Sequence, residues 1–291
     1  MEIGEPDFAT PASIIEAGQQ ALSDQKTHYT PALGLPQLRQ KIADYYQQTF
    51  NLTISAERIV ITPGASGALQ LALAALIDPG DKVLMTDPGY PCNRHMVRWL
   101  GGEAVDVAVD ATTRFQLSAA LLEKNWDNKT KIVMVSSPSN PTGTRLDKTS
   151  MQLLIETVER LGGALIVDEL YQGFVYDQSD FTALSCSDQV IVVNSFSKYF
   201  GMTGWRLGWL VLPEFMLSAV DKIAQNIFLA ASTPAQYAAL AAFEPAAISV
   251  LQERRDIFKE RRDYLLVALR ELGVIVEVEH EGAYYIYANC S

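Results

Sequence analysis

The chain has 291 residues, of which 48% are hydrophobic and 20% charged, a composition typical of a globular protein rather than a disordered one. Its 34 acidic and 23 basic side chains give a formal net charge of -11, which disfavours nonspecific binding to nucleic acid or to an anionic membrane. The sequence shows neither a run of about 18 apolar residues nor a basic and apolar leader, so we expect a soluble, cytoplasmic protein with a small-molecule partner.

From about residue 57 the chain alternates short apolar runs with helical patterns. Four strand and helix pairs are predicted: "RIVIT" with "GALQLALAALI", "KVLMT" with "CNRHMVRWL", "EAVDVAV" with "LSAALLEK", and "KIVMVSS" with "MQLLIETVERL". Three further strands are predicted at "ALIVDE", "QVIVVNSFS" and "RLGWLVL". Strands that are apolar throughout are typical of a mainly parallel sheet with helices on both faces. The predicted fold class is therefore α/β, with a three-layer α/β/α architecture.

The segments outside this alternation are mostly helical. "GLPQLRQKIADYY" predicts an amphipathic helix with a packing role, and residues 214–272 predict further helices. The strand-like pieces "VIVEVEH" and "AYYIYA" follow. The three cysteines and three histidines lack the spacing of metal ligands, so we predict buried thiols, no disulfide framework and no metal site.

Polar side chains cluster where the predicted strands end. "VMVSSPSNPTG", "LIVDELYQGF" and "VVNSFSKYFGMTGWR" each carry them, and "ITPGASGAL" places a glycine-rich turn after the first strand. Ligands of such sheets bind at the carboxyl ends of the strands, so we expect these residues to converge on one site. The candidates are Asn140, Asp168, Tyr171, Ser195, Ser197, Lys198 and Arg206.

Each candidate taken alone has a structural explanation. Asp168 is equally explained as a helix cap, Asn140 as a turn former, Lys198 as a surface charge and "GASGA" as a tight turn. Their conjunction favours a site. A lysine among apolar and aromatic residues is desolvated, which lowers its pKa and favours the neutral amine that forms a Schiff base with an aldehyde. Lys198 is therefore the predicted nucleophile.

These motifs resemble those of the class I/II pyridoxal-phosphate-dependent aminotransferases, which have the aspartate aminotransferase fold (fold type I). The match runs from "GEPDF" at residues 4–8 through "GAYYIYA" at residues 282–288, and its most specific part is the separation of eight residues between Lys198 and Arg206. The resemblance implies pyridoxal 5'-phosphate as the cofactor and Lys198 as the Schiff-base lysine. It also implies an N-terminal segment of a small domain at 1–20, a large cofactor-binding domain at 21–244 and a partial small α+β domain at 245–291.

The resemblance assigns the cofactor phosphate to a set of groups that suit an anion. An arginine, two hydroxyls and two backbone N–H groups at a helix N-terminus make up this set, namely Arg206, Ser195, Ser197, Ala65 and Ser66.

The resemblance also assigns roles around the cofactor ring. Asp168 keeps the pyridinium nitrogen protonated, and Asn140 and Tyr171 hydrogen-bond the phenolic oxygen. Tyr90 in "DPGYP" stacks on the ring, although an ordinary packed aromatic explains it as well. Lys198, Asp168 and Tyr171 are the implied catalytic residues.

Two assignments concern the substrate and a second subunit. Gly4 and Asn140 are the implied substrate-binding residues, and the substrates are an amino acid and a 2-oxo acid. Tyr29 in "THYTPALGLPQLR" matches a tyrosine that reaches the phosphate of the neighbouring subunit, which implies a homodimer with shared active sites.

The implied reaction is transfer of an amino group from an L-amino acid to a 2-oxo acid through a Lys198 aldimine. Aspartate, alanine and aromatic amino acids all remain as donors. A carbon–sulfur β-lyase on the same fold is an alternative, because it uses the same cofactor residues. An effector-sensing regulatory domain is a second alternative. Such domains are fused to DNA-binding domains, but no helix-turn-helix pattern precedes "GEPDF".

Members of the family extend beyond both ends of the match. Relative to them, the chain lacks the N-terminal arm and the C-terminal part of the small domain, which carries the arginine that pairs with the substrate carboxylate. A trimmed chain and a natural truncation both explain this. For a natural truncation we expect cofactor binding to survive better than turnover.

Overall fold

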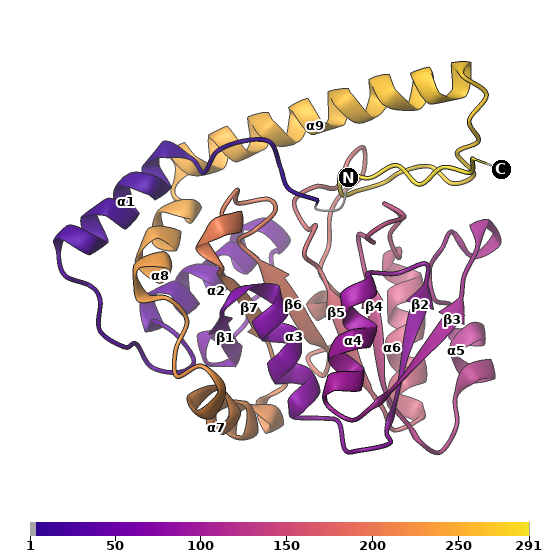
Figure 1. The fold of residues 1–291 in the computed structure, drawn as a ribbon, viewed down its shortest axis with the longest axis horizontal. Coiled ribbons are helices and arrows are strands. Elements are labelled where there is room, and N and C mark those ends of the chain that lie inside the picture. Colours follow the sequence, from indigo (N-terminus) through magenta and orange to yellow (C-terminus); the bar gives the residue numbers. More distant parts are fainter. Residues whose placement is uncertain (1–3, 291) are drawn as a thin grey trace. The chain divides into compact units, whose positions relative to one another are not determined.

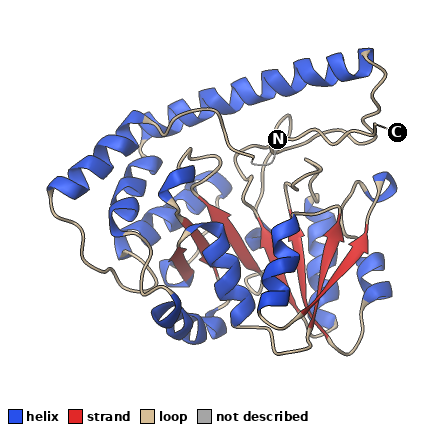
Figure 2. Ribbon diagram, in the orientation of Figure 1, coloured by secondary structure: helices blue, strands red, loops and turns tan. Residues whose placement is uncertain are grey.

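The structure, a computed structural model, describes residues 4–290. Seven strands form one sheet in the order β1-β7-β6-β5-β4-β2-β3, and helices and strands alternate along the chain (Figures 1 and 2). β2 pairs in parallel with both β3 and β4, and β4 pairs in parallel with β5, whereas β1 and β7 are antiparallel. The predicted α/β class with a mainly parallel sheet is confirmed.

The chain divides into two compact units. One comprises Met1–Ala75 and Val193–Arg255, and the other comprises Leu76–Val192 and Asp256–Ser291. The predicted domain boundaries after residues 20 and 244 divide the chain differently and stay a prediction. Residues 1–3 of the predicted N-terminal segment and residue 291 of the predicted small domain lie outside the described residues.

The first unit contains the antiparallel strand pair and most of the long helices. Its strands are β1 (Ile59–Thr62) and β7 (Gly208–Val211), and its helices are α1 (Ala12–Ser23), α2 (Pro36–Phe50), α3 (Gly64–Ala74), α7 (Leu217–Ile227) and α8 (Thr233–Leu240). The predicted amphipathic helix is α2, which begins with Pro36 in its first turn and ends at Asn51 in the left-handed region. Trp209 in β7 is fully buried and donates through Nε1 to the Tyr46 hydroxyl of α2 at 3.2 Å, so this helix is fixed to the strand by packing and by a hydrogen bond.

The second unit contains the parallel strands. They are β2 (Lys82–Asp87), β3 (Glu103–Ala108), β4 (Thr130–Ser136) and β5 (Ala164–Asp168), and the helices α4 (Pro91–Trp99), α5 (Ala119–Asn125) and α6 (Lys148–Arg160) connect them. In Figure 1, α4 lies in front of these strands and α6 behind them. Because β5 is buried from Leu165 to Asp168, its apolar residues pack on both sides and its end places polar residues at the edge of the core.

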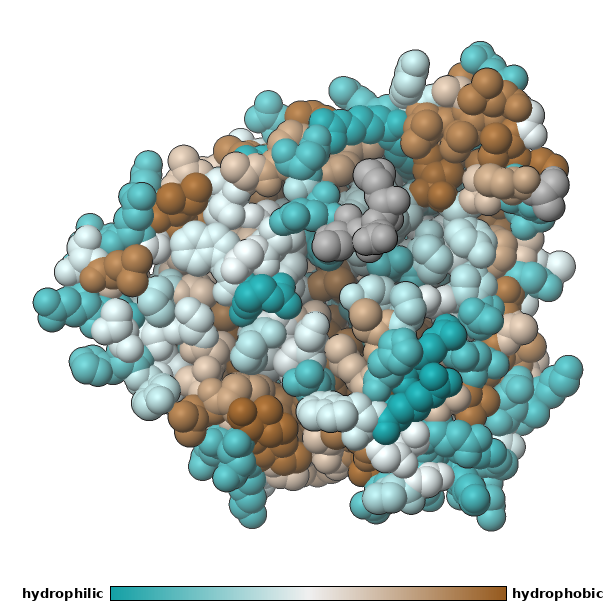
Figure 3. Space-filling view, viewed as in Figure 1, coloured by the Kyte–Doolittle hydropathy of each residue, from teal (hydrophilic) through white to brown (hydrophobic). Residues whose placement is uncertain are grey.

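Two elements continue from one unit into the other along the chain. These are β6 (Ile191–Ser195) and α9 (Pro245–Glu271). The C-terminal end of α9 and the turn after it expose large apolar side chains, including Tyr264 at 77% and Leu272 at 78%, and Figure 3 shows hydrophobic residues gathered there. Within residues 4–290 nothing covers these side chains.

The two predicted C-terminal strands are wrong. Residues 274–280 and 283–288 lie in extended segments that form only isolated bridges, Val175 with Gly282 and Ile275 with Asn289. The two residues that join these segments bond to a loop, since the amides of Glu281 and Gly282 both donate to the Gly143 carbonyl at 3.0 Å. A strand needs a continuous ladder of hydrogen bonds with its partner, and the bridges of these segments are isolated ones.

The prediction of buried thiols is also wrong. Cys92 in the first turn of α4 and Cys290 near the C-terminus are exposed, and Cys186 is half-buried. The helices within residues 4–290 include none with the length and apolar character that crossing a membrane requires.

The hydrogen bonds of the buried Gln236 side chain predict that replacing this residue lowers the stability of the protein. Gln236 in α8 is 0% exposed, accepts from the Leu35 amide at 2.8 Å and donates to Ala231 O at 2.9 Å and Thr30 Oγ1 at 3.0 Å. Gln236→Ala leaves these groups without partners, so we expect the free energy of unfolding to fall by about 2–3 kcal/mol in urea titrations. Gln225→Ala is the control, because Gln225 is exposed and bonds only within its helix, to Asp221. Equal losses for the two variants would contradict the prediction.

Candidate active site

The loop that follows β6 carries Lys198. Its backbone is fastened at both ends, because the amide of Phe196 donates to Leu207 O at 3.1 Å and that of Gly201 donates to Lys198 O at 3.1 Å. The rings of Phe196 and Phe200 are buried with their centroids 5.2 Å apart. Lys198, between these two rings in the sequence, is half-buried.

The ammonium of Lys198 has a partner in the N-terminal segment. Nζ donates to the carbonyl of Gly4, so the structure brings together two residues that the sequence assigned to the site. Thr203 Oγ1 donates to Glu5 at 2.5 Å, and Thr10 Oγ1 donates to Gly201 O at 2.7 Å. The N-terminal segment therefore lies along the Lys198 loop and is held there by side chains.

Arg206 lies against the first turn of α3. A Cβ on Gly64 would come within 2.6 Å of Arg206 Nη2, and Gly64 has a φ of +73°, so both the space and the backbone conformation require glycine. Arg206 Nη1 lies 3.4 Å from Ser197 Oγ. Pro63 at the N-cap offers no side-chain cap, which leaves the first-turn amides of α3, at Ala65 and Ser66, uncapped.

This arrangement fits a phosphate group. A guanidinium, a hydroxyl and the uncapped N-terminus of a helix of 11 residues are gathered in one unit, and each favours an anion. Ser195, whose predicted role toward the phosphate stays a prediction, has partners within the loop. Its hydroxyl is buried, donates to Leu207 O at 3.2 Å and accepts from the Ser197 amide at 3.0 Å, so it fixes the loop that presents Ser197.

In the second unit, Asp168, Tyr171 and Asn140 form the polar end of β5 and its surroundings. Asp168 is the last residue of β5 and is 6% exposed, and its Oδ1 accepts from the Leu170 amide at 3.0 Å. Asn140 Nδ2 lies 3.4 Å from the hydroxyl of Tyr171, which is 2% exposed. Buried groups of this kind can donate to or accept from a ligand without competition from water.

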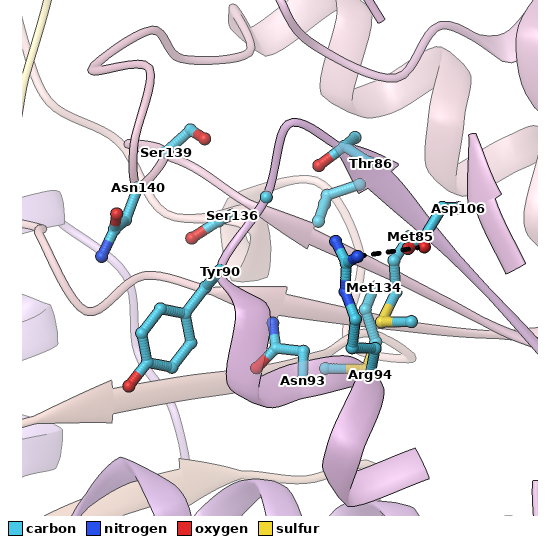
Figure 4. A pocket seen from close by; sticks show the side chains of 12 residues that line it. Met85, Thr86, Tyr90, Asn93, Arg94, Asp106, Met134, Ser136, Ser139 and Asn140 are labelled. Carbon is cyan, nitrogen blue, oxygen red and sulfur yellow. Dashed lines mark ion pairs between the residues drawn. The ribbon is translucent and has the colours of Figure 1, made fainter. Parts of the chain in front are cut away.

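Tyr90 and Asn140 line a small cavity with an ion pair at its other end. Figure 4 shows Tyr90 and Asn140 on one side of this cavity and Arg94, which pairs with Asp106 at 3.2 Å, on the other. The cavity measures about 20 Å³, which is room for a water molecule rather than a substrate side chain. A hydrogen bond with Cys92, then burial and the charge of Asp168, raise the pKa of Tyr90 to about 12.

Two residues of this region were not among the predicted site residues. Tyr285 lies with its hydroxyl 2.8 Å from that of Tyr171 and 3.4 Å from Asn140 Nδ2. Glu169, beside Asp168, is 2% exposed and accepts from the Ala183 amide at 2.7 Å. A second carboxylate directly after a buried strand was a signal for Glu169, and the tyrosines of "GAYYIYA" were one for Tyr285.

The predicted site residues thus form two groups, one within each unit. The first group has Gly4, Ala65, Ser66, Ser195, Ser197, Lys198 and Arg206, and the second has Tyr90, Asn140, Asp168 and Tyr171. Tyr29 is 81% exposed in the unit that holds Lys198, and its role toward a neighbouring subunit stays a prediction.

Comparison with known proteins gives a consistent result. Residues 1–291 match the family described as aminotransferase class I and II. The chain is 36% identical to a (5-formylfuran-3-yl)methyl phosphate transaminase of Methanocaldococcus jannaschii, over 99% of the chain and 75% of the relative. It is 38% identical to a valine–pyruvate aminotransferase of Mycobacterium tuberculosis, over 100% of the chain and 75% of the relative. The solved structure of a single mutant of Thermus thermophilus aspartate aminotransferase superposes with a TM-score of 0.95 at 32% identity, over 99% of this chain and 76% of that one.

Burial of Glu169 predicts a pH dependence of stability. Desolvation raises the pKa of this carboxyl from 4.5 to about 8, although hydrogen bonds from Ala183, Thr182 and Gln172 oppose the shift. The folded protein therefore holds a proton that the unfolded chain has released, so the free energy of unfolding falls as the pH rises between these values.

Glu169→Gln removes the titrating group from this site. We expect the free energy of unfolding of the unmodified chain to fall by about 3–4 kcal/mol more than that of the variant between about pH 5 and about pH 8, as measured in urea. Glu156→Gln, at an exposed position of α6, should keep the unmodified slope. Parallel profiles for the unmodified chain and Glu169→Gln would show that Glu169 titrates normally.

Proposed function

Because the chain belongs to the aminotransferase class I and II family, we propose that it uses pyridoxal 5'-phosphate to move an amino group from an L-amino acid to a 2-oxo acid. The observation that carries the proposal is the placement of Arg206 and Ser197 at the uncapped first turn of α3, in the same unit as Lys198. When bound, the cofactor supplies an aldehyde that reacts with amines and a ring that withdraws electrons from the substrate.

The first unit supplies the covalent and phosphate-binding groups of the proposal. Arg206, the hydroxyls of Ser195 and Ser197 and the amides of Ala65 and Ser66 hold the phosphate, and Ser195 Oγ also accepts from the Ser197 amide. Lys198 Nζ is the amine that binds the aldehyde and that later moves a proton at the substrate's Cα. Lys198 is half-buried, and its Nζ donates to the carbonyl of Gly4.

The second unit supplies the groups for the cofactor ring. The carboxylate of Asp168, buried at the end of β5, would hold a proton on the pyridinium nitrogen, and its burial limits the screening of that ion pair by water. Asn140 and Tyr171 donate to the phenolic oxygen, and Tyr90 stacks on the ring face. Gly4 and Asn140 face the substrate, which is an amino acid or a 2-oxo acid.

The proposal extends to assembly and organisation. The enzyme acts in the cytoplasm as a homodimer in which the exposed Tyr29 reaches the phosphate bound by the other subunit. Residues 21–244 form the cofactor domain, and residues 1–20 and 245–291 belong to the small domain. Chemical crosslinking and sedimentation of the purified protein test the dimer.

Lys198→Ala tests the cofactor assignment. The purified protein with added cofactor should show a visible absorbance band that depends on pH, and Lys198→Ala should lose it because no other amine is assigned to the aldehyde. Lys222→Ala, an exposed lysine of α7, is the control and should keep the band. Retention of the band by Lys198→Ala would overturn the assignment of the nucleophile.

A panel of amino acids tests the reaction. The relatives are named for substrates as different as valine, pyruvate and (5-formylfuran-3-yl)methyl phosphate, so the panel should hold aspartate, alanine, valine and aromatic amino acids. A transferase converts the visible band to that of the amine form of the cofactor and releases a 2-oxo acid in about equimolar amount in a single half-reaction. Continuous release of pyruvate and ammonia from a cysteine conjugate, with the visible band retained, would identify a carbon–sulfur β-lyase instead.

A further inference from the structure

Three polar groups from distant parts of the second unit meet at one point. The hydroxyls of Tyr171 and Tyr285 are 2.8 Å apart, and Asn140 Nδ2 lies 3.4 Å from each of them. The ring of Tyr171 also meets the ring of Tyr285 edge to face, with centroids 5.6 Å apart. Tyr285 therefore contacts both residues that the proposed function assigns to the phenolic oxygen of the cofactor.

The number of protons in this group restricts its hydrogen bonds. A phenol has one O–H to donate, so the single bond between Tyr171 and Tyr285 has one donor. Burial first, and then the neighbouring phenols of Tyr284 and Tyr285, raise the pKa of Tyr171 above its ordinary value, so Tyr171 keeps its proton. If Tyr171 donates this proton to a ligand, the donor between the two tyrosines must be Tyr285.

We propose that Tyr285 is a positioning residue, whose O–H donates to Tyr171 Oη and turns the Tyr171 proton toward the phenolic oxygen of the cofactor. The inference rests on the proposed function, since it concerns the same site. It adds a residue to which the resemblance gave no role, in a segment that lies more than a hundred positions from Tyr171.

The backbone around Tyr285 is held by the two segments that carry its partners. The amides of Glu281 and Gly282 donate to the carbonyl of Gly143, three residues after Asn140, at 3.0 Å each. The amide of Ala283 donates to Phe174 O, three residues after Tyr171, at 2.9 Å. The segments that carry Asn140 and Tyr171 therefore both bind residues 281–283 by backbone hydrogen bonds, which fixes the position of Tyr285 next to its two partners.

Side chains reinforce this attachment. Glu281 pairs with Arg114 at 2.7 Å, and the buried ring of His280 fills the space beside Gly143. A Cβ on Gly143 would lie 1.9 Å from His280 Nε2, so only glycine fits there. The segment is therefore packed as well as hydrogen-bonded, which a positioning role requires.

The proposal has a spectroscopic consequence. A bond from Tyr285 polarises the Tyr171 O–H and strengthens its donation to the phenolic oxygen, which stabilises negative charge on that oxygen. A more stabilised oxygen attracts the proton on the Lys198 nitrogen less, so Tyr285 lowers the pKa at which the visible band of the bound cofactor titrates.

Tyr285→Phe in the protein loaded with pyridoxal phosphate tests this. We expect the titration of the visible band to shift upward by about 0.5–1 pH unit, the worth of one net hydrogen bond. Tyr171→Phe should shift it further in the same direction, and the double variant should match Tyr171→Phe, because Tyr285 acts through Tyr171. Tyr287→Phe is the matched control and should leave the titration unchanged, since the Tyr287 ring packs on Phe115, 5.2 Å away.

Several results would overturn the proposal. One is a visible band whose titration in Tyr285→Phe stays unshifted or shifts downward. Another is a double variant in which the shift of this titration equals the sum of the two single shifts. An unmodified protein with added cofactor but without a visible band would instead overturn the proposed function and the inference with it. A band that is present but insensitive to Tyr285→Phe would overturn the inference alone.

Discussion

The contact between Arg206 and the first turn of α3 is the constraint on which the first group of site residues depends. The guanidinium occupies the space that a Cβ on Gly64 would fill, and Arg206 itself, two residues before β7, adopts a positive φ of 53°. The residue after it, Leu207, accepts from the Phe196 amide and from Ser195 Oγ. One arginine conformation therefore closes the loop between β6 and β7, and Lys198 lies within that closed loop.

The second group depends on burial rather than on charge. Asp168 and Glu169 are adjacent and both buried, yet their carboxylates bond to different segments, Asp168 to Leu170 and Glu169 to Ala183 and Thr182. A pair of free carboxylates in such a place would repel each other and lose hydration. Because burial raises the pKa of Glu169 to about 8, Glu169 is mostly protonated near neutrality and the pair carries less negative charge.

The sequence was most informative where a local pattern determines the structure. The apolar runs at residues 132–135 and 165–167 identified β4 and β5, because a buried parallel strand needs apolar residues on both faces. The predicted helix "GALQLALAALI" begins three residues after the start of α3, since Gly64, Ala65 and Ser66 do not continue the apolar periodicity. Residues 274–280 alternate as a strand does, but a strand also needs a partner, and the choice of partner is not a local property. Tyr285 was missed for the same reason, because its partners Tyr171 and Asn140 are 114 and 145 positions away.

The charges of the two groups complement different ends of the proposed cofactor. The first group holds two basic residues. Lys198 suits the aldehyde, which reacts with an amine, and Arg206 suits the phosphate. The second group holds one carboxylate, Asp168, which suits a protonated ring nitrogen, and three neutral donors, Asn140, Tyr171 and Tyr285. A neutral donor stabilises a phenolic oxygen without fixing a full positive charge beside it, so the oxygen remains available to the nitrogen of Lys198. A cation in place of Tyr171 would keep the phenolic oxygen ionised and weaken the attraction of that oxygen for the proton on the Lys198 nitrogen. Neutral hydrogen bonds, each worth a fraction of an ion pair, let the protein adjust this attraction in small steps, and a chain of two tyrosines provides one more step than a single tyrosine would.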